Sequence, residues 1–161
     1  MRKQEILDEI VKTEEHLANM KRMLAEREYE RWKPQYTQEY YSINAIEEVT
    51  ENIWRGSDID KCKYDFYNCF QTREQAKAEA EKILVRRMLE NIATRLNGDK
   101  VFSWNSYQCK YFIELCYGEK LSINTCTICK KQGTVYCLDE RFLDIAIRQI
   151  GQERLKNYLR N

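Results

Sequence analysis

The heptad pattern of residues 1–33 constrains the fold of this chain more than any other feature of its sequence. Apolar side chains recur there at alternating intervals of four and three residues, and Thr13 takes the remaining position; these side chains are Ile6, Ile10, Leu17, Met20 and Leu24. Such spacing forms the seam of a coiled coil, in which two narrow apolar stripes pack against each other. We therefore expect one long helix that pairs with the same helix of a second copy in a homodimer.

The same stripe would also suit an amphipathic helix that folds back on its own domain, because the width of a seam separates the two arrangements only weakly. Pro34 is the one proline of the sequence, and proline ends a helix or forces an extended exit. The sequence therefore predicts a boundary at this point. A coiled-coil helix is expected over 1–33 and an α+β domain over 34–161.

The α+β domain reads as two similar halves, at about 38–98 and 100–161. Each half shows two strands around a polar turn, a short third strand, a residue that favours the N-cap of a helix, and the helix itself. The N-cap residues are Thr72 and Asp139. This weak internal repeat predicts an antiparallel sheet that packs under two helices.

The details of the two halves follow from turn signals and strand-forming residues. In the first half, a hairpin is expected over 40–54, followed by a loop with the sequence RGSDIDKCKYD. The helix after Thr72 should stop at Asn97-Gly98, a typical C-terminal signal. In the second half, the strands flank a turn at 117–120, and a last helix at 152–158 closes the chain.

The stretch CTICKKQGTVYC, from Cys126 to Cys137, contains two cysteines at a spacing found in zinc sites. A strand would send Cys126 and Cys129 to opposite faces, whereas zinc needs thiolates that converge on one ion. The sequence has no second pair at this spacing, and its single histidine, His16, lies in the heptad helix. We interpret the stretch as a β-hairpin with reduced cysteines, and expect no metal and no other cofactor.

The residue inventory also argues against an enzyme. With His16 outside the α+β domain, Cys–His and Ser–His–Asp mechanisms are out of reach there. The sequence lacks the glycine-rich loops that cradle phosphate groups. Asp58 and Asp60 could hold a divalent cation, but aspartates beside Gly56-Ser57 are more typical of a polar turn. We therefore expect no catalytic residues.

Binding is the remaining class of function, and its candidate residues are basic and aromatic. The chain carries 27 Lys and Arg against 26 Asp and Glu, which argues against a broad nucleic-acid footprint but leaves room for a local patch. Aromatic rings beside basic groups suit a base, a nucleotide or a protein loop. Glutamates interleave with the basic positions, as in a solvated helix face. The candidate partner-binding residues are Lys82, Arg86, Arg87, Lys130, Lys131, Tyr64 and Tyr67.

Several motifs resemble a set of small uncharacterised proteins of Firmicutes phages and prophages. After the heptad helix they are Trp32-Lys33-Pro34, Tyr40-Tyr41-x-Ile43, Trp54, Asp60, Asn68-Cys69-Phe70-x-Thr72-x-Glu74-x-Ala76 and the ending IGQERLKNYL. Tyr67 departs from the pattern, because members tend to have glycine there. The resemblance implies a small protein made inside a bacterial host cell, and it implies no activity or site residues.

The leading hypothesis is a non-enzymatic, dimeric binding protein that inhibits bacterial immunity, such as an anti-CRISPR protein that docks on a Cas nuclease. One alternative is a sponge that sequesters a nucleotide immune signal, and a second is a weak DNA- or RNA-binding module. The expected partner is a host protein or a protein–nucleic acid complex. The opening MRKQEILDEI lacks an apolar signal core, and no long apolar run follows, so we expect a cytoplasmic protein that does not enter membranes.

Overall fold

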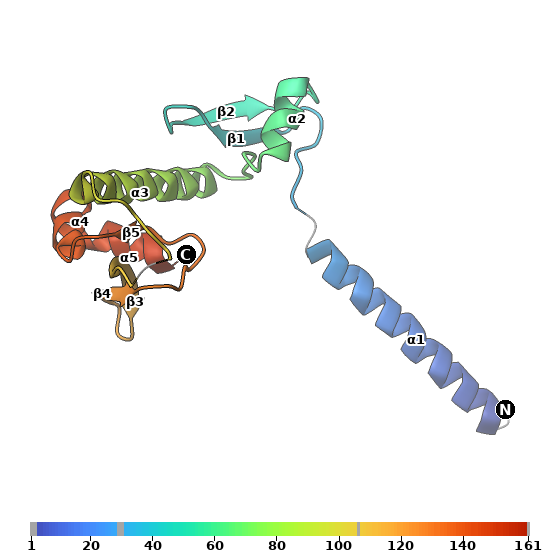
Figure 1. The fold of residues 1–161 in the computed structure, drawn as a ribbon. Helices are drawn as coiled ribbons and strands as arrows, with labels where there is room; N and C mark the ends of the chain where they lie inside the picture. The colour runs from blue at the N-terminus through green and yellow to red at the C-terminus, as the bar shows by residue number, and fades with distance from the viewer. Residues whose placement is uncertain (1–2, 29–30, 106, 161) are drawn as a thin grey trace.

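The computed structural model describes residues 3–28, 31–105 and 107–160, and combines helices with two small antiparallel sheets (Figure 1). The predicted α+β class is confirmed. In chain order the elements are α1 (Lys3–Glu28), β1 (Glu39–Ile43), β2 (Val49–Ile53), α2 (Asp58–Asp65), α3 (Arg73–Asn97), β3 (Lys110–Cys116), β4 (Lys120–Cys126), β5 (Tyr136–Cys137), α4 (Phe142–Ile150) and α5 (Gln152–Arg160).

The predicted N-terminal helix is present as α1, which stands apart from the other elements (Figure 1). It ends at Glu28, a few residues before the predicted boundary. Of the predicted seam, Ile10, Leu17 and Met20 are 44–47% exposed, while the side chains of Ile6 and Leu24 lie outside the described residues. The seam is therefore open to a partner, and its pairing stays a prediction.

The N-terminal unit consists of the hairpin β1–β2 and the helix α2. Its strands pair in the register Tyr41↔Glu51, and Phe70 makes an isolated bridge to the other side of Tyr41. The loop predicted after β2 is wrong, because residues 58–65 form α2. Ser57 caps this helix and Asp60 closes the capping box, so the polar residues that suggested a turn instead start a helix.

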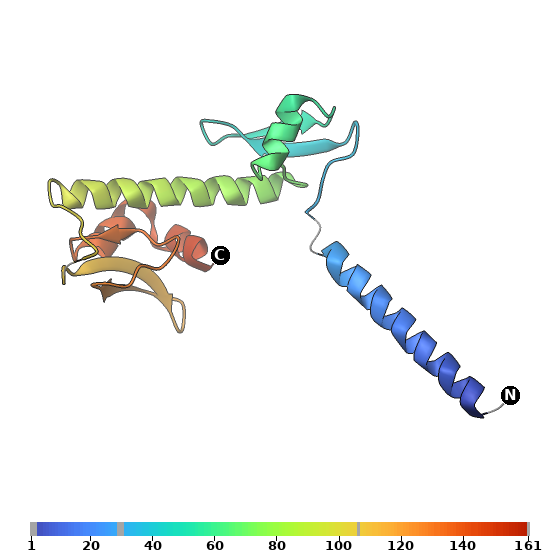
Figure 2. The ribbon, with the colours of Figure 1, turned by 45° about the vertical axis from the view of Figure 1, so that its right-hand side comes forward.

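Helix α3 joins the two halves of the globular part, with the N-terminal unit at its beginning and the remaining elements along its second half (Figure 2). It begins after Thr72, whose capping box with Gln75 confirms the predicted cap. It ends at Asn97, and Gly98 follows as its C-cap with φ +52°, which confirms the predicted stop. The small residues Ala76 and Ala80 are buried where α3 contacts β1 and β2.

The C-terminal unit contains a three-stranded sheet in the order β4-β3-β5. The predicted turn between β3 and β4 is confirmed. The predicted hairpin from Cys126 to Cys137 is wrong: β5 pairs with β3, so the two cysteines lie on opposite sides of that central strand. Contacts distant in sequence hold β5 at the free edge of β3, where the Tyr136 ring lies 5.5 Å from that of Phe112 and Cys137 is buried.

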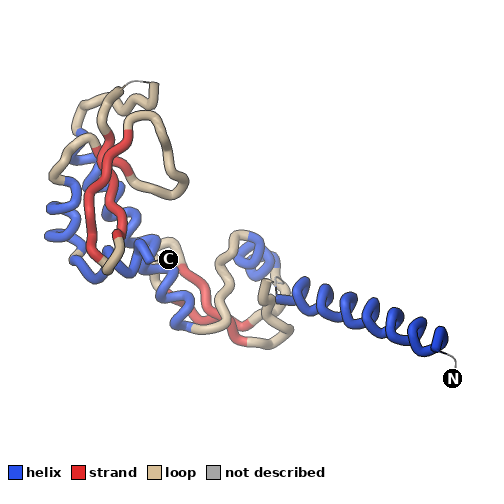
Figure 3. Tube along the Cα trace, turned by 90° about the horizontal axis from the view of Figure 1, so that it is seen from below, coloured by secondary structure: helices blue, strands red, loops and turns tan. Residues whose placement is uncertain are grey.

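The helices α3, α4 and α5 lie on one side of this sheet (Figure 3, helices blue and strands red). The main core lies between them; its buried residues are Val85, Leu89, Ile92, Ala93, Ile113, Leu121, Cys137, Phe142, Ala146, Ile150 and Leu155. The predicted N-cap Asp139 is wrong, because α4 begins at Phe142 after Arg141. The Asp139 carboxylate instead accepts the backbone N–H of Arg141 at 2.9 Å, within a turn that precedes the helix. The predicted last helix is present as α5.

The two halves share part of their strand pairing. In each, a hairpin is followed by a segment that pairs with the outer side of its first strand, through Phe70 in one half and Cys137 in the other. Helix α2, however, intervenes only in the first half. An internal duplication therefore stays a prediction.

Candidate partner-binding surface

Three adjoining hollows of about 640, 270 and 550 Å³ lie around α3, where this helix faces the β1–β2 loop, α5 and the loop before β5. Glu81 lines the first two hollows, and Lys82 and Tyr158 line the second and third, so neighbouring hollows share a wall. The α3 residues that line them are shifted by one position from each hollow to the next, so the hollows follow one another around the helix. We call these three hollows together the α3 groove.

The α3 groove carries charges of both signs in close pairs. Arg154 lies 2.6 Å from Glu81, Arg86 lies 2.9 Å from Glu90, and Lys82 lies 3.5 Å from Glu79. The hydrogen bond that Arg86 donates to Glu90 raises the pKa of Arg86, so this guanidinium stays charged. Apolar side chains also line the groove, among them Val49 and Leu84, which is 38% exposed. Such a surface is chemically suited to a polypeptide with mixed charge and apolar side chains.

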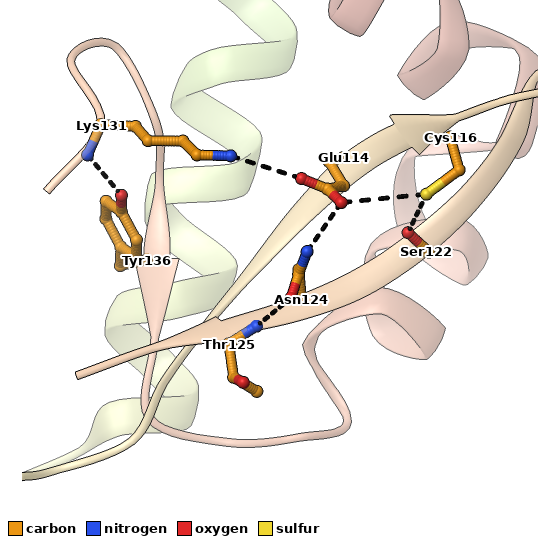
Figure 4. A network of polar contacts seen from close by, with 7 residues as sticks. All are labelled: Glu114, Cys116, Ser122, Asn124, Thr125, Lys131 and Tyr136. Atoms are coloured by element: carbon orange, nitrogen blue, oxygen red, sulfur yellow. Dashed lines mark hydrogen bonds and ion pairs between the residues drawn. The ribbon is translucent and has the colours of Figure 1, made fainter. Parts of the chain in front are cut away.

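The structure divides the sequence-predicted residues among different surfaces. Lys82 and Arg86 line the third hollow of the α3 groove. Arg87 turns toward the hairpin loop and forms an ion pair with Glu47. Lys130 and Lys131 lie before β5. Lys131 is on the sheet face that points away from α3, α4 and α5 (Figure 4), and the Lys130 ammonium group lies 5.9 Å from the centroid of the Trp104 ring.

This open face of the C-terminal sheet contains the polar network of Figure 4. Glu114 on β3 accepts a hydrogen bond of 2.7 Å from Asn124 on β4, and the Lys131 ammonium group lies 3.5 Å from its other oxygen. The hydrogen bond from Asn124, followed by the nearby Lys131, lowers the pKa of Glu114. The hydroxyl of Ser122 and the thiol of Cys116 lie 2.9 Å apart at the far end of the network. These groups satisfy one another, so the network stabilises the sheet face.

Aromatic rings next to this network form a second small core that the sequence analysis missed. The Trp104 ring lies 5.0 Å from that of Tyr136, which in turn packs on Phe112. Phe112 and Tyr136 are only 4% and 8% exposed, so their faces are not open for a base to stack on. Lys110, Phe112 and Glu114 alternate along β3 and therefore point to the same face of the sheet. This alternation is the sequence signal that could have located the second core.

Lys110 is the least expected member of this second core. Its side chain is fully buried, and its ammonium group donates to the carbonyl oxygens of Gln108 at 2.7 Å and Thr127 at 2.8 Å. The group also lies 4.9 Å from the centroid of the Trp104 ring. Lys110 therefore ties together the two loops that cover this sheet face.

Tyr64 and Tyr67 belong to the N-terminal unit, away from the predicted lysines (Figure 1). The guanidinium carbon of Arg31 lies 3.9 Å from the ring centroid of Tyr64 and 4.0 Å from that of Tyr67. Arg31 also donates a hydrogen bond to the Tyr64 carbonyl. The two tyrosines thus anchor the segment that follows α1.

The same unit does not support a cation between Asp58 and Asp60. Asp60 is buried and accepts hydrogen bonds from the Tyr40 hydroxyl at 2.7 Å, the Arg55 N–H at 3.0 Å and the Ser57 hydroxyl at 2.8 Å. Its neighbour Asp58 is exposed and pairs with Lys61 at 3.4 Å. Among the residues that the structure describes, no three His, Cys, Asp or Glu side chains are grouped as metal ligands would be.

Comparisons of the chain with protein-family models, with curated proteins and with solved structures give no match. The resemblance to phage proteins therefore stays a prediction. Within the described part of the chain, none of the helices combines the length and apolarity that crossing a membrane requires.

Proposed function

We propose that this protein is a non-catalytic, homodimeric binding protein that holds a partner polypeptide in the α3 groove. The observation that carries this proposal is that neighbouring hollows share Glu81, Lys82 and Tyr158, so that the α3 groove borders the N-terminal unit, α3 and α5. Its charged rim and apolar lining resemble the composition of protein–protein interfaces. Partner binding through exposed mixed surfaces needs no reactive side chains.

A protein partner fits the groove better than a nucleic acid or a nucleotide. Each of Lys82, Arg86 and Arg154 already lies beside a glutamate, and a polyanion would have to bind next to those carboxylates. A nucleotide sponge needs an enclosed pocket with stacking rings. Tyr158 is the one aromatic residue among the described residues that line the α3 groove.

The resemblance to phage proteins supports a more specific proposal about the target. We propose that the partner is a component of bacterial immunity in the host cytoplasm, such as a Cas nuclease, and that binding occludes or distorts it. The sponge for a nucleotide signal and the DNA- or RNA-binding module are the alternatives. The two alternatives can be told apart by experiment. The affinity of a nucleic-acid-binding module falls steeply with salt, whereas a nucleotide sponge retains its ligand through purification.

The experiment that tests the proposal is a DNA-cleavage assay with a panel of Firmicutes Cas nucleases. We expect the wild-type protein to inhibit at least one of them. The double variant Lys82→Glu/Arg86→Glu should inhibit at least tenfold less well, since it places like charges beside Glu79 and Glu90 and changes the rim of the groove. Lys120→Glu, at an exposed position outside the groove, is the matched control and should inhibit like the wild type.

Two results would contradict the proposal at different levels. If no nuclease of the panel is inhibited, the anti-CRISPR role is wrong. If a nuclease is inhibited equally by the wild type and by the double variant, the role stands but the α3 groove is not the binding surface. Circular dichroism of the variants shows whether the fold is retained.

A further inference from the structure

We infer that α1 pairs with α1 of a second copy in the antiparallel orientation. This inference rests on the proposed homodimer and adds the geometry of its interface. It is carried by the exposed seam of α1 and by the charges on the two edges of that seam.

The seam of α1 needs a partner. The helix has 26 residues and is therefore roughly 39 Å long, yet Ile10, Leu17 and Met20 are each 44–47% exposed. Helices in proteins gain most of their stability from packing of an apolar face. The polar seam residue Thr13 donates its hydroxyl to the Glu9 carbonyl at 2.8 Å, which leaves its methyl group free to pack in the seam.

The heptad places charged residues at known positions beside the seam. With Ile10 and Leu17 at position a, Glu14 and Lys21 fall at e, and Glu9 falls at g. In a parallel dimer, each g residue faces the following e residue of the partner helix. Glu9 would then face Glu14 of the second copy on both edges, and like charges at such positions are destabilising.

The antiparallel orientation removes this repulsion. There, e residues face e residues, so Glu14 of one helix can pair with Lys21 of the other. The two-fold symmetry of the dimer gives this ion pair twice. The described residues of α1 therefore favour antiparallel pairing through charge complementarity.

This orientation has a consequence for binding. The segments that follow α1 would leave the coiled coil at opposite ends, which separates the two globular parts by about the length of the helix. The two α3 grooves of the dimer would then be far apart and each open to a partner. Such a dimer can bridge two partner molecules, which multiplies affinity when both sites are engaged.

The test is the dissociation constant of the full-length dimer, measured by sedimentation equilibrium at low salt. We expect Glu14→Lys and Lys21→Glu each to weaken the dimer by roughly five- to thirtyfold, and the double swap to restore much of the loss. Glu15→Lys is the matched control, because position f faces away from the seam. It should leave the dissociation constant within about twofold of the wild type.

Each contrary outcome has a distinct meaning. In a parallel dimer, Glu14→Lys would face Glu9 and strengthen the association, which would overturn the antiparallel inference and leave the homodimer intact. A wild-type protein that is monomeric at all concentrations would overturn the homodimer itself. Equal effects of Glu14→Lys and Glu15→Lys would show that the charges beside the seam do not set the orientation.

Discussion

The hydroxyl of Tyr40 donates a hydrogen bond of 2.7 Å to the carboxylate of Asp60, and both side chains are buried. This contact joins β1 to the first turn of α2. The same carboxylate accepts the backbone N–H of Ser57 at 3.1 Å and closes the capping box. One buried group thus holds the strand, the loop and the helix of the N-terminal unit together.

The Asp60 carboxylate should make the stability of this unit depend on pH. Burial alone would raise the pKa of Asp60, but hydrogen bonds from Tyr40, Arg55 and Ser57 outweigh it and lower the pKa from 3.8 to about 2. Because the folded state favours the charged form, its contribution of about 2 kcal/mol is complete above pH 3.8 and is lost as the pH falls toward 2.

We therefore expect Asp60→Asn to lower the free energy of unfolding by about 2 kcal/mol at neutral pH, and the gap to the wild type to close as the pH approaches the folded pKa. Urea unfolding followed by circular dichroism over this pH range measures the gap. Asp58→Asn, at the exposed neighbour, should remain close to the wild type throughout. A gap for Asp60→Asn that does not change with pH would refute this account.

Lys110 should stabilise the C-terminal unit through the two loops that it joins. Replacement by methionine keeps most of the unbranched side chain and removes the donors to Gln108 and Thr127, so we expect a loss of about 1–3 kcal/mol in the free energy of unfolding. Lys120→Met, at an exposed position, serves as the control. An unchanged or more stable Lys110→Met protein would show that burying this charge costs as much as its hydrogen bonds contribute.

Tyr67 adopts φ +58°, a conformation that favours glycine. Tyr67→Gly and Tyr67→Ala both remove the ring that contacts Arg31, so they differ mainly in their backbone. We expect the glycine variant to be the more stable of the two by about 1 kcal/mol, measured as the difference in thermal unfolding. If the alanine variant is equally stable, the left-handed conformation at Tyr67 is not strained.

Charged residues in the seam of α1 should abolish the dimer without unfolding the globular part. We expect Leu17→Glu combined with Leu24→Glu to give monomers, because each dimer would bury four carboxylates in its apolar interface. Size-exclusion chromatography with light scattering measures the mass, and near-ultraviolet circular dichroism reports the core around Phe142. Unchanged mass would show that the seam does not mediate association.

Features set by local sequence were predictable. The cap at Thr72 and the stop at Gly98 follow from residues within one turn of each helix end, and the structure confirms both. Helix α2 was missed because Ser57 and Asp60 suit a polar turn and a capping box equally well. Local pattern alone could not choose between these two uses of the same residues.

Features set by contacts distant in sequence were not predictable. The pairing of β5 with β3 depends on the free edge of a strand more than twenty residues earlier, so the hairpin expected from Cys126 to Cys137 did not form. From the sequence alone, Lys110 would be expected to be exposed at the start of a strand. In the structure it is buried, and its ammonium group donates to backbone carbonyls of two separate loops. The α3 groove likewise arises only when α5 packs beside α3.

Native mass spectrometry of the freshly purified protein tests the central claim most directly, because it weighs the oligomer and any retained ligand together. The account predicts a dimer of two 19.5 kDa chains with no retained mass. A monomer would contradict the pairing of α1. A dimer that retains several hundred daltons per chain would contradict the protein-binding role and favour the nucleotide sponge.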